Sequence, residues 1–297
     1  MTNKIKRGRI AFLCALILLI SAACTPYQVG RTPVSSASLT LNGSLLQIDV
    51  IDVGNADAIL ICQGGESLLI DAGENGDGDN VVNFLRSRRV DSLDYVIATH
   101  PDADHIGGMD IVINEIPVGK FIMSVMPDSI TPTTKTYLDL LEELDSKNVD
   151  VTEAGPGSRY SLGKAAINLL GPAGEFNSTN SMSVVCRVDF GKRRFLFMGD
   201  AGIDAEDALL SANADLKADF IKIAHHGSHS SSQEIFLTAV DPEYAAISCG
   251  VNNRYKHPHP KTLALLKNLG IFCYRTDLSG TVSFTSDGDT IAVKTEK

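Results

Sequence analysis

The sequence predicts one domain of the α/β (α+β) class, and three observations support this prediction. Apolar runs rich in Val and Ile, typical of strands, alternate with segments whose apolar residues recur at helical spacing. The 297 residues, 44% hydrophobic and 21% charged, suffice for a substantial core. Three strands at the start are separated only by turns with Gly, Asn and Asp, which predicts an antiparallel meander. We assign residues 44–297 to this domain.

The first residues predict export. Residues 1–23 combine a basic start, an apolar stretch from Ile10 to Ile20 and a small-residue end, as in a signal peptide. A membrane-spanning helix is the alternative, but the stretch is shorter than the ~20 residues that a span needs. The ending resembles a bacterial lipobox with Ser21 in place of leucine, and implies lipidation of Cys24; cleavage by an ordinary signal peptidase is the alternative. Residues 24–43 then form a flexible tether for a lipoprotein on the extracytoplasmic side of the cell membrane.

The charge of the chain limits its partners. The formal net charge is −10, and removal of residues 1–23 takes away four basic and no acidic residues, which leaves about −14. Such acidity opposes unspecific binding to DNA or anionic lipid, although a local basic patch can outweigh the mean. The dense basic cluster consists of Arg187, Lys192, Arg193 and Arg194.

Cysteine usage favours free thiols over disulfides. Four cysteines after Cys24 lie in apolar, strand-like contexts without C-x-x-C spacing, where Cys acts as a small hydrophobe. They are Cys62, Cys186, Cys249 and Cys273.

The first half of the domain contains strands and helices in alternation. Strands are expected at 46–54, 58–62 and 67–73, where apolar residues end in turns. Apolar spacing and a basic end predict a helix at 81–89, and the β-branched run 93–98 predicts a buried strand. A short helix is expected at 106–113, an amphipathic helix at 137–147, and strands at 149–153 and 166–170.

The second half repeats this alternation. Apolar runs that stop at polar turns predict strands at 184–190, 194–198, 219–224 and 244–249. Helices are expected at 204–210 and 261–269, and closing strands after Gly280.

A dense group of potential metal ligands follows the strand 93–98. His100, Asp102, Asp104 and His105 lie within six residues, at the point where a strand-ending turn can direct side chains inward. Imidazole nitrogen together with carboxylate oxygen suits zinc, manganese or iron rather than an all-oxygen calcium site. The alternative is a polar turn that contains two histidines by accident.

This group resembles the His-x-His-x-Asp-His signature of the metallo-β-lactamase superfamily, with Asp102 in place of the second histidine. The variant, and the stretch 52–58, look like the hydrolase domain of the ComEC competence proteins and its free-standing lipoprotein relatives. The resemblance implies a four-layer αβ/βα sandwich of two β-meander halves, with helices outside and metals at the edge between the sheets. It also implies that Asp71 supports the metal loop through hydrogen bonds; a plain turn aspartate is the alternative.

Further residues are placed at the site by the same resemblance. Asp200 in the Gly-Asp strand end matches the carboxylate that bridges two metals. Asn180 and Ser181 stand where many members have a ligand histidine, and we expect them to line the site; a loop with turn chemistry is the alternative. Because successive side chains of a strand alternate, the adjacent His225 and His226 are not expected to point the same way, so one would bind metal and the other would face the substrate or support a ligand. By its place before Gly227, His226 resembles the family's final ligand, and we prefer it to His225. Ser228 is expected near the substrate.

The segment 252–260 adds candidate catalytic groups. Pro258 and Pro260 hold the backbone extended, which would fix His257 and His259 at the edge of the site for leaving-group protonation or phosphate contact. A rigid surface loop is the alternative. The predicted catalytic groups are thus Asp104, Asp200, His257 and His259.

The expected chemistry is hydrolysis by a metal-bound hydroxide with two divalent metal ions, Zn or Mn. We assign His100 and Asp102 to one ion, Asp200 to both, and the remaining ligands Asp104, His105 and His226 to the other. The coordination of the first ion is richer in carboxylate, which favours manganese or a phosphate-bound metal over tight zinc. The resemblance points to a phosphodiester substrate, most concretely to an exported nuclease that degrades DNA or RNA outside the cell, with a DNA-uptake channel as its partner. Small phosphodiesters such as phosphocholine, lactams or lactones, and a non-catalytic binding lipoprotein are the alternatives.

Overall fold

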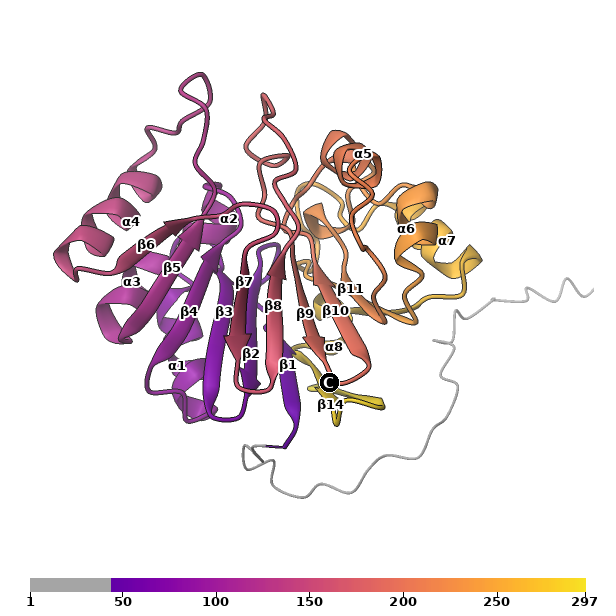
Figure 1. Ribbon diagram of the computed structural model, residues 1–297, viewed down its shortest axis with the longest axis horizontal. Coiled ribbons are helices and arrows are strands. Elements are labelled where there is room, and N and C mark those ends of the chain that lie inside the picture. Colours follow the sequence, from indigo (N-terminus) through magenta and orange to yellow (C-terminus); the bar gives the residue numbers. More distant parts are fainter. Residues whose placement is uncertain (1–43) are drawn as a thin grey trace, which may run out of the picture. The chain divides into compact units, whose positions relative to one another are not determined.

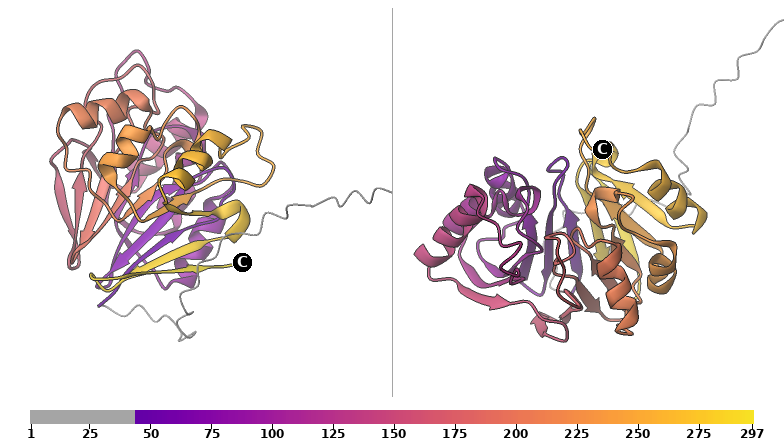
Figure 2. Two further views of the ribbon diagram at one scale, coloured as in Figure 1. Left: turned by 90° about the vertical axis from the view of Figure 1, so that its right-hand side faces the viewer. Right: turned by 90° about the horizontal axis from the view of Figure 1, so that it is seen from above.

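The computed structural model describes residues 44–297, which form two mixed β-sheets packed face to face with helices on both outer faces (Figures 1 and 2). The predicted α/β sandwich is therefore confirmed. The first sheet has the order β15 (Ile291–Thr295), β14 (Val282–Ser286), β1 (Leu46–Val50), β2 (Ala58–Gln63), β3 (Glu66–Ala72), β4 (Leu93–Ala98), β5 (Val118–Met123), β6 (Asp150–Glu153). The second has the order β13 (Phe272–Arg275), β12 (Tyr244–Ile247), β11 (Phe220–Lys222), β10 (Arg193–Phe197), β9 (Cys186–Phe190), β8 (Ala165–Leu169), β7 (Arg159–Leu162).

Helices cover the outer face of each sheet (Figure 1). The first sheet carries α1 (Gly78–Ser87), α3 (Met109–Glu115) and α4 (Lys135–Ser146), and the short α2 (Ala103–Ile106) precedes α3. The second sheet carries α5 (Ile203–Ser211), α6 (Glu234–Val240) and α7 (Pro260–Asn268). A 3₁₀ turn η1 (His225–Gly227) follows β11, and α8 (Thr276–Ser279) follows β13.

Strand β2 shows why its sequence is apolar without interruption. Ile59 and Ile61 point between the sheets, whereas Leu60 and Cys62 point outward under the helices. Successive side chains of a strand alternate between its faces, so a strand buried on both faces needs apolar residues at every position. The sandwich thus has one core between the sheets and one under each helical layer.

The implied division into two β-meanders is wrong in part. The antiparallel meander β1–β2–β3 is present, but β3 to β6 are parallel neighbours, and so are β10 to β13. A helical crossover connects each of these parallel pairs, whereas a tight turn could only join antiparallel strands. Parallel order brings the carboxyl ends of β4, β10 and β11 toward the site.

The helix predicted at 106–113 is divided in two. Helix α2 ends at Ile106 and α3 begins at Met109, with Gly107 and Gly108 between them. A side chain on Gly107 would collide with the backbone of Asn75, and one on Gly108 with the backbone of Ala72. The two glycines therefore let the segment that carries His100 to His105 approach the end of β3 closely.

Two further points concern the covalent state and the membrane. The four cysteines of the described part are free, with Cys62, Cys186 and Cys249 buried and Cys273 half-buried, which confirms the prediction of free thiols. Within residues 44–297 no helix has the length and hydropathy required for a membrane span. The predicted signal peptide, the tether 24–43 and Cys24 lie outside the described residues.

Candidate metal centre

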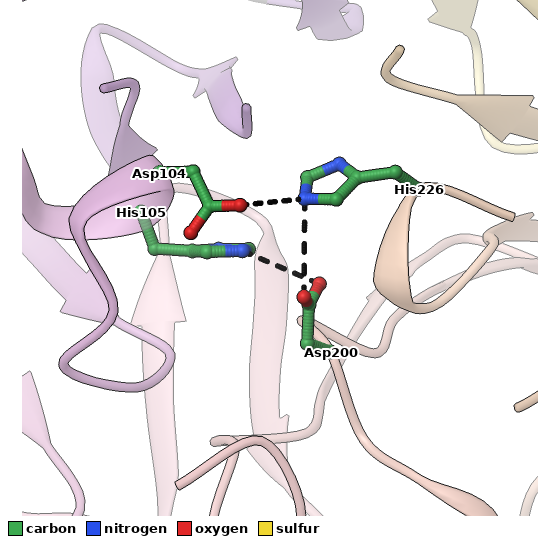
Figure 3. Close-up of side chains that lie close together, drawn as sticks. All are labelled: Asp104, His105, Asp200 and His226. Carbon is green, nitrogen blue, oxygen red and sulfur yellow. Dashed lines mark ion pairs between the residues drawn. The ribbon is translucent and has the colours of Figure 1, made fainter. Parts of the chain in front are cut away.

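Four side chains from three strand ends converge into a compact cluster (Figure 3). Asp104 and His105 come from α2 after β4, Asp200 follows β10, and His226 lies in η1 after β11. One potential ligand atom of each lies within 4.8 Å of all the others. Nε2 of His105 is 3.3 Å from Asp200 Oδ1, and Nε2 of His226 is 3.3 Å from Asp104 Oδ2 and 3.8 Å from Asp200 Oδ2.

The second nitrogen of each clustered histidine is held by a fixed partner. Nδ1 of His105 lies 2.7 Å from Asp71 Oδ2, and Nδ1 of His226 lies 3.1 Å from the Ser248 carbonyl oxygen. Both partners accept hydrogen bonds, so each Nδ1 carries the proton and each Nε2 presents a lone pair to the cluster.

The cluster fits a divalent metal ion. Nε2 of His105, Nε2 of His226 and Oδ1 of Asp200 are buried and have no hydrogen-bond partner in the described part of the chain. Buried polar atoms are normally paired, and these converge on one point with the mixed nitrogen and oxygen donors that zinc and manganese accept.

The electrostatics of the cluster also favour a cation. Burial alone lowers the pKa of a histidine, but Asp200, Asp104 and Asp57 raise the pKa of His226 to about 9. Asp200 and Asp71 likewise raise the pKa of His105 well above its ordinary value. Burial raises the pKa of Asp200, but the histidines outweigh it and hold that pKa well below its usual range. A carboxylate field that stabilises a proton on Nε2 also stabilises a metal ion there.

Asp71 supports the metal loop from a strained backbone position. Its φ of 57° is in the left-handed region, and its side chain is fully buried. Besides His105, the carboxylate accepts hydrogen bonds from the amide (2.8 Å) and the hydroxyl (2.7 Å) of Thr99. The structure thus places Asp71 where it orients both the loop and a ligand imidazole.

His100 and Asp102, assigned to the first metal, lie beside the cluster rather than in it. His100 is buried, its Nε2 has no hydrogen-bond partner among the described residues, and its ring centroid is 4.1 Å from that of His105. Burial and the charge of His105 lower its pKa. The Asp102 side chain is 42% exposed, with Oδ2 3.7 Å from His100 Nε2.

The alternation argument for His225 and His226 is wrong. Both residues have a positive φ, 52° and 51°, in the turn η1, so they do not follow the alternation of a strand. Nε2 of His225 also faces Asp200, 3.7 Å from Oδ2. His226 is buried and contacts Asp104 as well, whereas His225 is partly exposed and its Nδ1 lies near Asn180 Nδ2 (3.4 Å) and Ser230 Oγ (3.2 Å).

Ser181, Ser228 and His259 make contacts away from the cluster. The Ser181 hydroxyl donates to Asp204 Oδ1 (2.6 Å) at the start of α5. Ser228 Oγ is 2.9 Å from Ser230 Oγ, and Nδ1 of His259 accepts from the Lys261 amide as the N-cap of α7. These hydrogen bonds stabilise the loops and helix starts around the site.

His257 lies at the edge of the cluster. Its ring centroid is 5.6 Å from that of His225 and 6.5 Å from that of His226. Burial and these two histidines lower its pKa to about 4, so the ring is neutral at pH 7 and can donate one hydrogen bond.

A buried ion pair beneath the site escaped the sequence analysis. Lys222 in β11 is fully buried and donates to Asp57 Oδ2 (2.8 Å) and to the Ile223 carbonyl oxygen (3.1 Å). Asp57 Oδ1 lies 3.5 Å from Nδ1 of His226. Burial alone would raise the pKa of Asp57, but Lys222 and His226 hold it well below its usual range. The position of Lys222 within an apolar strand could have indicated a buried ion pair from the sequence.

Residues 51–251 match the family model described as the metallo-β-lactamase superfamily. The match covers more than half of the chain, and with the site described above it shows that the protein belongs to this superfamily.

Curated relatives confirm the resemblance to competence proteins. The chain is 30% identical to ComE operon protein 3 of Bacillus subtilis, over 80% of this chain and 33% of that protein. It is 29% identical to Competence protein ComA of Neisseria gonorrhoeae, over 90% of this chain and 35% of that protein. Recombination protein 2 of Haemophilus influenzae is also 29% identical, over 80% of this chain and 28% of that protein. The chain thus spans about a third of the length of these relatives.

Solved structures show the same fold at low identity. CmlA, a diiron beta-hydroxylase from Streptomyces venezuelae, is 15% identical with a TM-score of 0.54, over 81% of this chain and 54% of that one. Igni18, a metallo hydrolase from Ignicoccus hospitalis, is 16% identical with a TM-score of 0.52, over 80% of this chain and 98% of that one. Their different chemistries mean that the fold alone does not define the reaction.

Proposed function

We propose that the protein is an exported, metal-dependent phosphodiesterase that cleaves DNA at the cluster of Asp104, His105, Asp200 and His226. The observation that carries this proposal is the convergence of unpartnered imidazole and carboxylate atoms whose outer partners fix them toward one point. An intact ligand set also argues against the alternative of a non-catalytic binding lipoprotein, which would be free to lose it.

The ligands would hold two divalent ions, with His100 and Asp102 at the first, Asp104, His105 and His226 at the second, and Asp200 shared. Bound divalent ions lower the pKa of a water molecule toward neutrality and polarise the phosphoryl oxygen. Asp71 and the Ser248 carbonyl keep the ligand imidazoles in the metal-binding tautomer. His257, at the edge of the cluster, donates a hydrogen bond to an oxygen of the substrate.

The choice of DNA as substrate is supported by the competence relatives. The chain matches only about a third of the length of these relatives. We therefore also propose that it acts together with a separate DNA-uptake channel. The acidic net charge opposes a polyanion, so the metal ions and local cations must attract the strand. Small phosphodiesters such as phosphocholine esters, and lactams or lactones, are the alternative substrates.

The test is hydrolysis by the full chain, purified in detergent and supplied with Mn²⁺ or Zn²⁺. Single-stranded DNA, double-stranded DNA and bis-p-nitrophenyl phosphate are offered side by side, with Asp200→Ala as control. We expect DNA cleavage that disappears in the variant. Cleavage of the small diester alone would retain the metal chemistry and move the substrate to small phosphodiesters, and no hydrolysis of any diester would overturn the proposal.

The proposed export has its own test. Labelling of producing cells with a radioactive fatty acid should mark the wild-type chain and leave Cys24→Ala unlabelled. An unlabelled wild-type chain would contradict lipidation.

A further inference from the structure

A cavity of about 750 Å³ opens beside the metal loop. Asp102 and Asp104 line one side of it, and Arg254 and Tyr255 from the segment after β12 line another. Asp104 also belongs to the metal cluster, so a molecule in the cavity reaches the cluster directly. The volume lies within the range of about 300–1,000 Å³ typical of small-molecule sites.

Arg254 is the only basic residue among those that line the cavity. Within residues 44–297 its guanidinium forms no ion pair, although four carboxylate side chains line the same cavity. Two of them, Asp102 and Asp104, belong to the proposed metal ligands. The other two, Glu74 and Asp77, already accept backbone N–H groups of their own turn, from Asn75 (3.1 Å) and Glu74 (2.9 Å). Arg254 therefore has its charge available for a ligand.

Stacked rings fix the position of Arg254. Its guanidinium carbon lies 4.6 Å from the Tyr255 ring centroid, and a guanidinium nitrogen donates to the Tyr255 hydroxyl. Tyr255 stacks on His257 with centroids 5.7 Å apart and an angle of 22° between the rings. Asn253 holds the segment from within, because it accepts from the His257 amide (2.9 Å) and donates to the Gly250 carbonyl (2.9 Å). A held guanidinium loses less conformational entropy on binding.

We propose that Arg254 binds a second phosphate of the substrate, next to the one that the metal centre cleaves. The inference rests on the proposed function and narrows it to strands with consecutive phosphates, such as single-stranded DNA. A planar guanidinium can bind two phosphate oxygens at once, and a diester with a single phosphate would leave this group unused. The site thus prefers an oligonucleotide to a small head-group diester.

The experiment compares two substrates that differ by one phosphate: thymidine 5′-(p-nitrophenyl phosphate) and the same compound with a 3′-phosphate. The full chain with Mn²⁺ is measured as wild type, Arg254→Gln and Arg254→Lys. Lys256→Asn is the matched control, since Lys256 is an exposed cation of the same segment that does not line the cavity, and Asn tolerates its φ of 58°.

We expect Arg254→Gln to lower kcat/KM for the two-phosphate substrate about 10- to 100-fold, mainly through KM, because a charge-assisted hydrogen bond is lost. The one-phosphate substrate should change less than about twofold, Arg254→Lys should keep part of the preference, and Lys256→Asn should keep all of it. Equal loss on both substrates, or no loss on either, would overturn the inference. The inference would also be overturned if the wild-type chain preferred p-nitrophenylphosphorylcholine to both nucleotides and Arg254→Gln hydrolysed that compound at the wild-type rate.

A binding measurement separates this inference from the proposed function. Fluorescence anisotropy of a labelled phosphorothioate oligothymidylate reports binding without hydrolysis. The slope of log affinity against log salt should become shallower by about 0.7 in Arg254→Gln, the value for one phosphate contact on a single strand. If no diester is hydrolysed, the proposed function is wrong and this slope still decides the role of Arg254; an unchanged slope contradicts it.

Discussion

At the scale of single residues, Asp71 determines which nitrogen of His105 carries the proton. Its carboxylate can only accept hydrogen bonds, so it requires the proton on Nδ1 of His105. In Asp71→Asn the amide group can donate to that nitrogen, which moves the proton to Nε2 and blocks the ligand position. We expect metal affinity, measured by calorimetry, to fall about 10- to 100-fold.

The control for this variant is Asp49→Asn. Asp49 is also buried and hydrogen-bonded, but its partners Arg88 and Ser283 do not belong to the cluster. It should lose stability and keep the metal affinity of the wild type. Equal affinities for Asp71→Asn and the wild type would show that the tautomer of His105 is set by another group.

The pair Lys222 and Asp57 carries a second prediction at this scale. Lys222→Met leaves a buried carboxylate without its cation, so the free energy of unfolding in urea should fall by about 3–5 kcal/mol. Adding Asp57→Asn removes the uncompensated charge, and the double variant should be more stable than Lys222→Met alone. A double-mutant cycle in which the two costs simply add would contradict a coupled ion pair.

At the scale of elements, Glu206 connects α5 to α6. The side chain is fully buried, and its carboxylate accepts the amides of Ser232 and Gln233 at the start of α6. Burial raises its pKa from 4.5 to about 7 despite these bonds. The folded chain therefore binds a proton between these pH values that the unfolded chain releases, and stability contributed by this group is lost as pH rises from 4.5 through 7.

Glu206→Gln should remove this dependence. At about 1.4 kcal/mol per pKa unit, the unfolding free energy of the wild type relative to the variant should fall by on the order of 3 kcal/mol over that range. Urea unfolding at several pH values measures the difference. Glu142→Gln, at an exposed position of α4, is the control and should follow the wild type. If the difference in unfolding free energy between the wild type and Glu206→Gln stayed constant over this pH range, protonation of Glu206 would not be linked to folding.

Most strands of the core could be predicted because both of their faces are buried, which makes apolar runs unmistakable. The elements that escaped prediction are short or half-exposed. Strand β5 contains Gly119 and Lys120, β7 and β13 have exposed residues, α6 has seven residues and α8 has four. Parallel pairing also escaped, since local sequence does not state which strand becomes a neighbour after a crossover.

The site was less predictable than the fold, for physical reasons. The left-handed backbone of His225 and His226 has no local signature such as glycine at either position. The Lys222–Asp57 pair joins residues 165 positions apart. The role inferred for Arg254 depends on the cavity that it lines, which is formed by segments distant in sequence. The segment from His100 to His105 was recognisable as a candidate metal loop because its potential ligands are neighbours in sequence.

At the scale of the whole molecule, the metal cluster connects the two sheets. Asp104 and His105 follow a strand of the first sheet, whereas Asp200 and His226 follow strands of the second. A metal that binds only the folded chain stabilises it by about 2.7 kcal/mol at a concentration of 100 times its Kd. A chelator should therefore lower Tm by about 5–10 °C. Asp200→Ala should show no chelator effect, and an equal shift in both chains would place the metal elsewhere.

Equilibrium dialysis against Mn²⁺ or Zn²⁺ followed by elemental analysis tests most directly whether the cluster, together with His100 and Asp102, holds two metal ions. We expect two ions per wild-type chain and loss of both tight sites in Asp200→Ala, because Asp200 is the shared ligand. Wild-type chains that retain no metal, or an Asp200→Ala variant that retains as much as the wild type, would contradict the account.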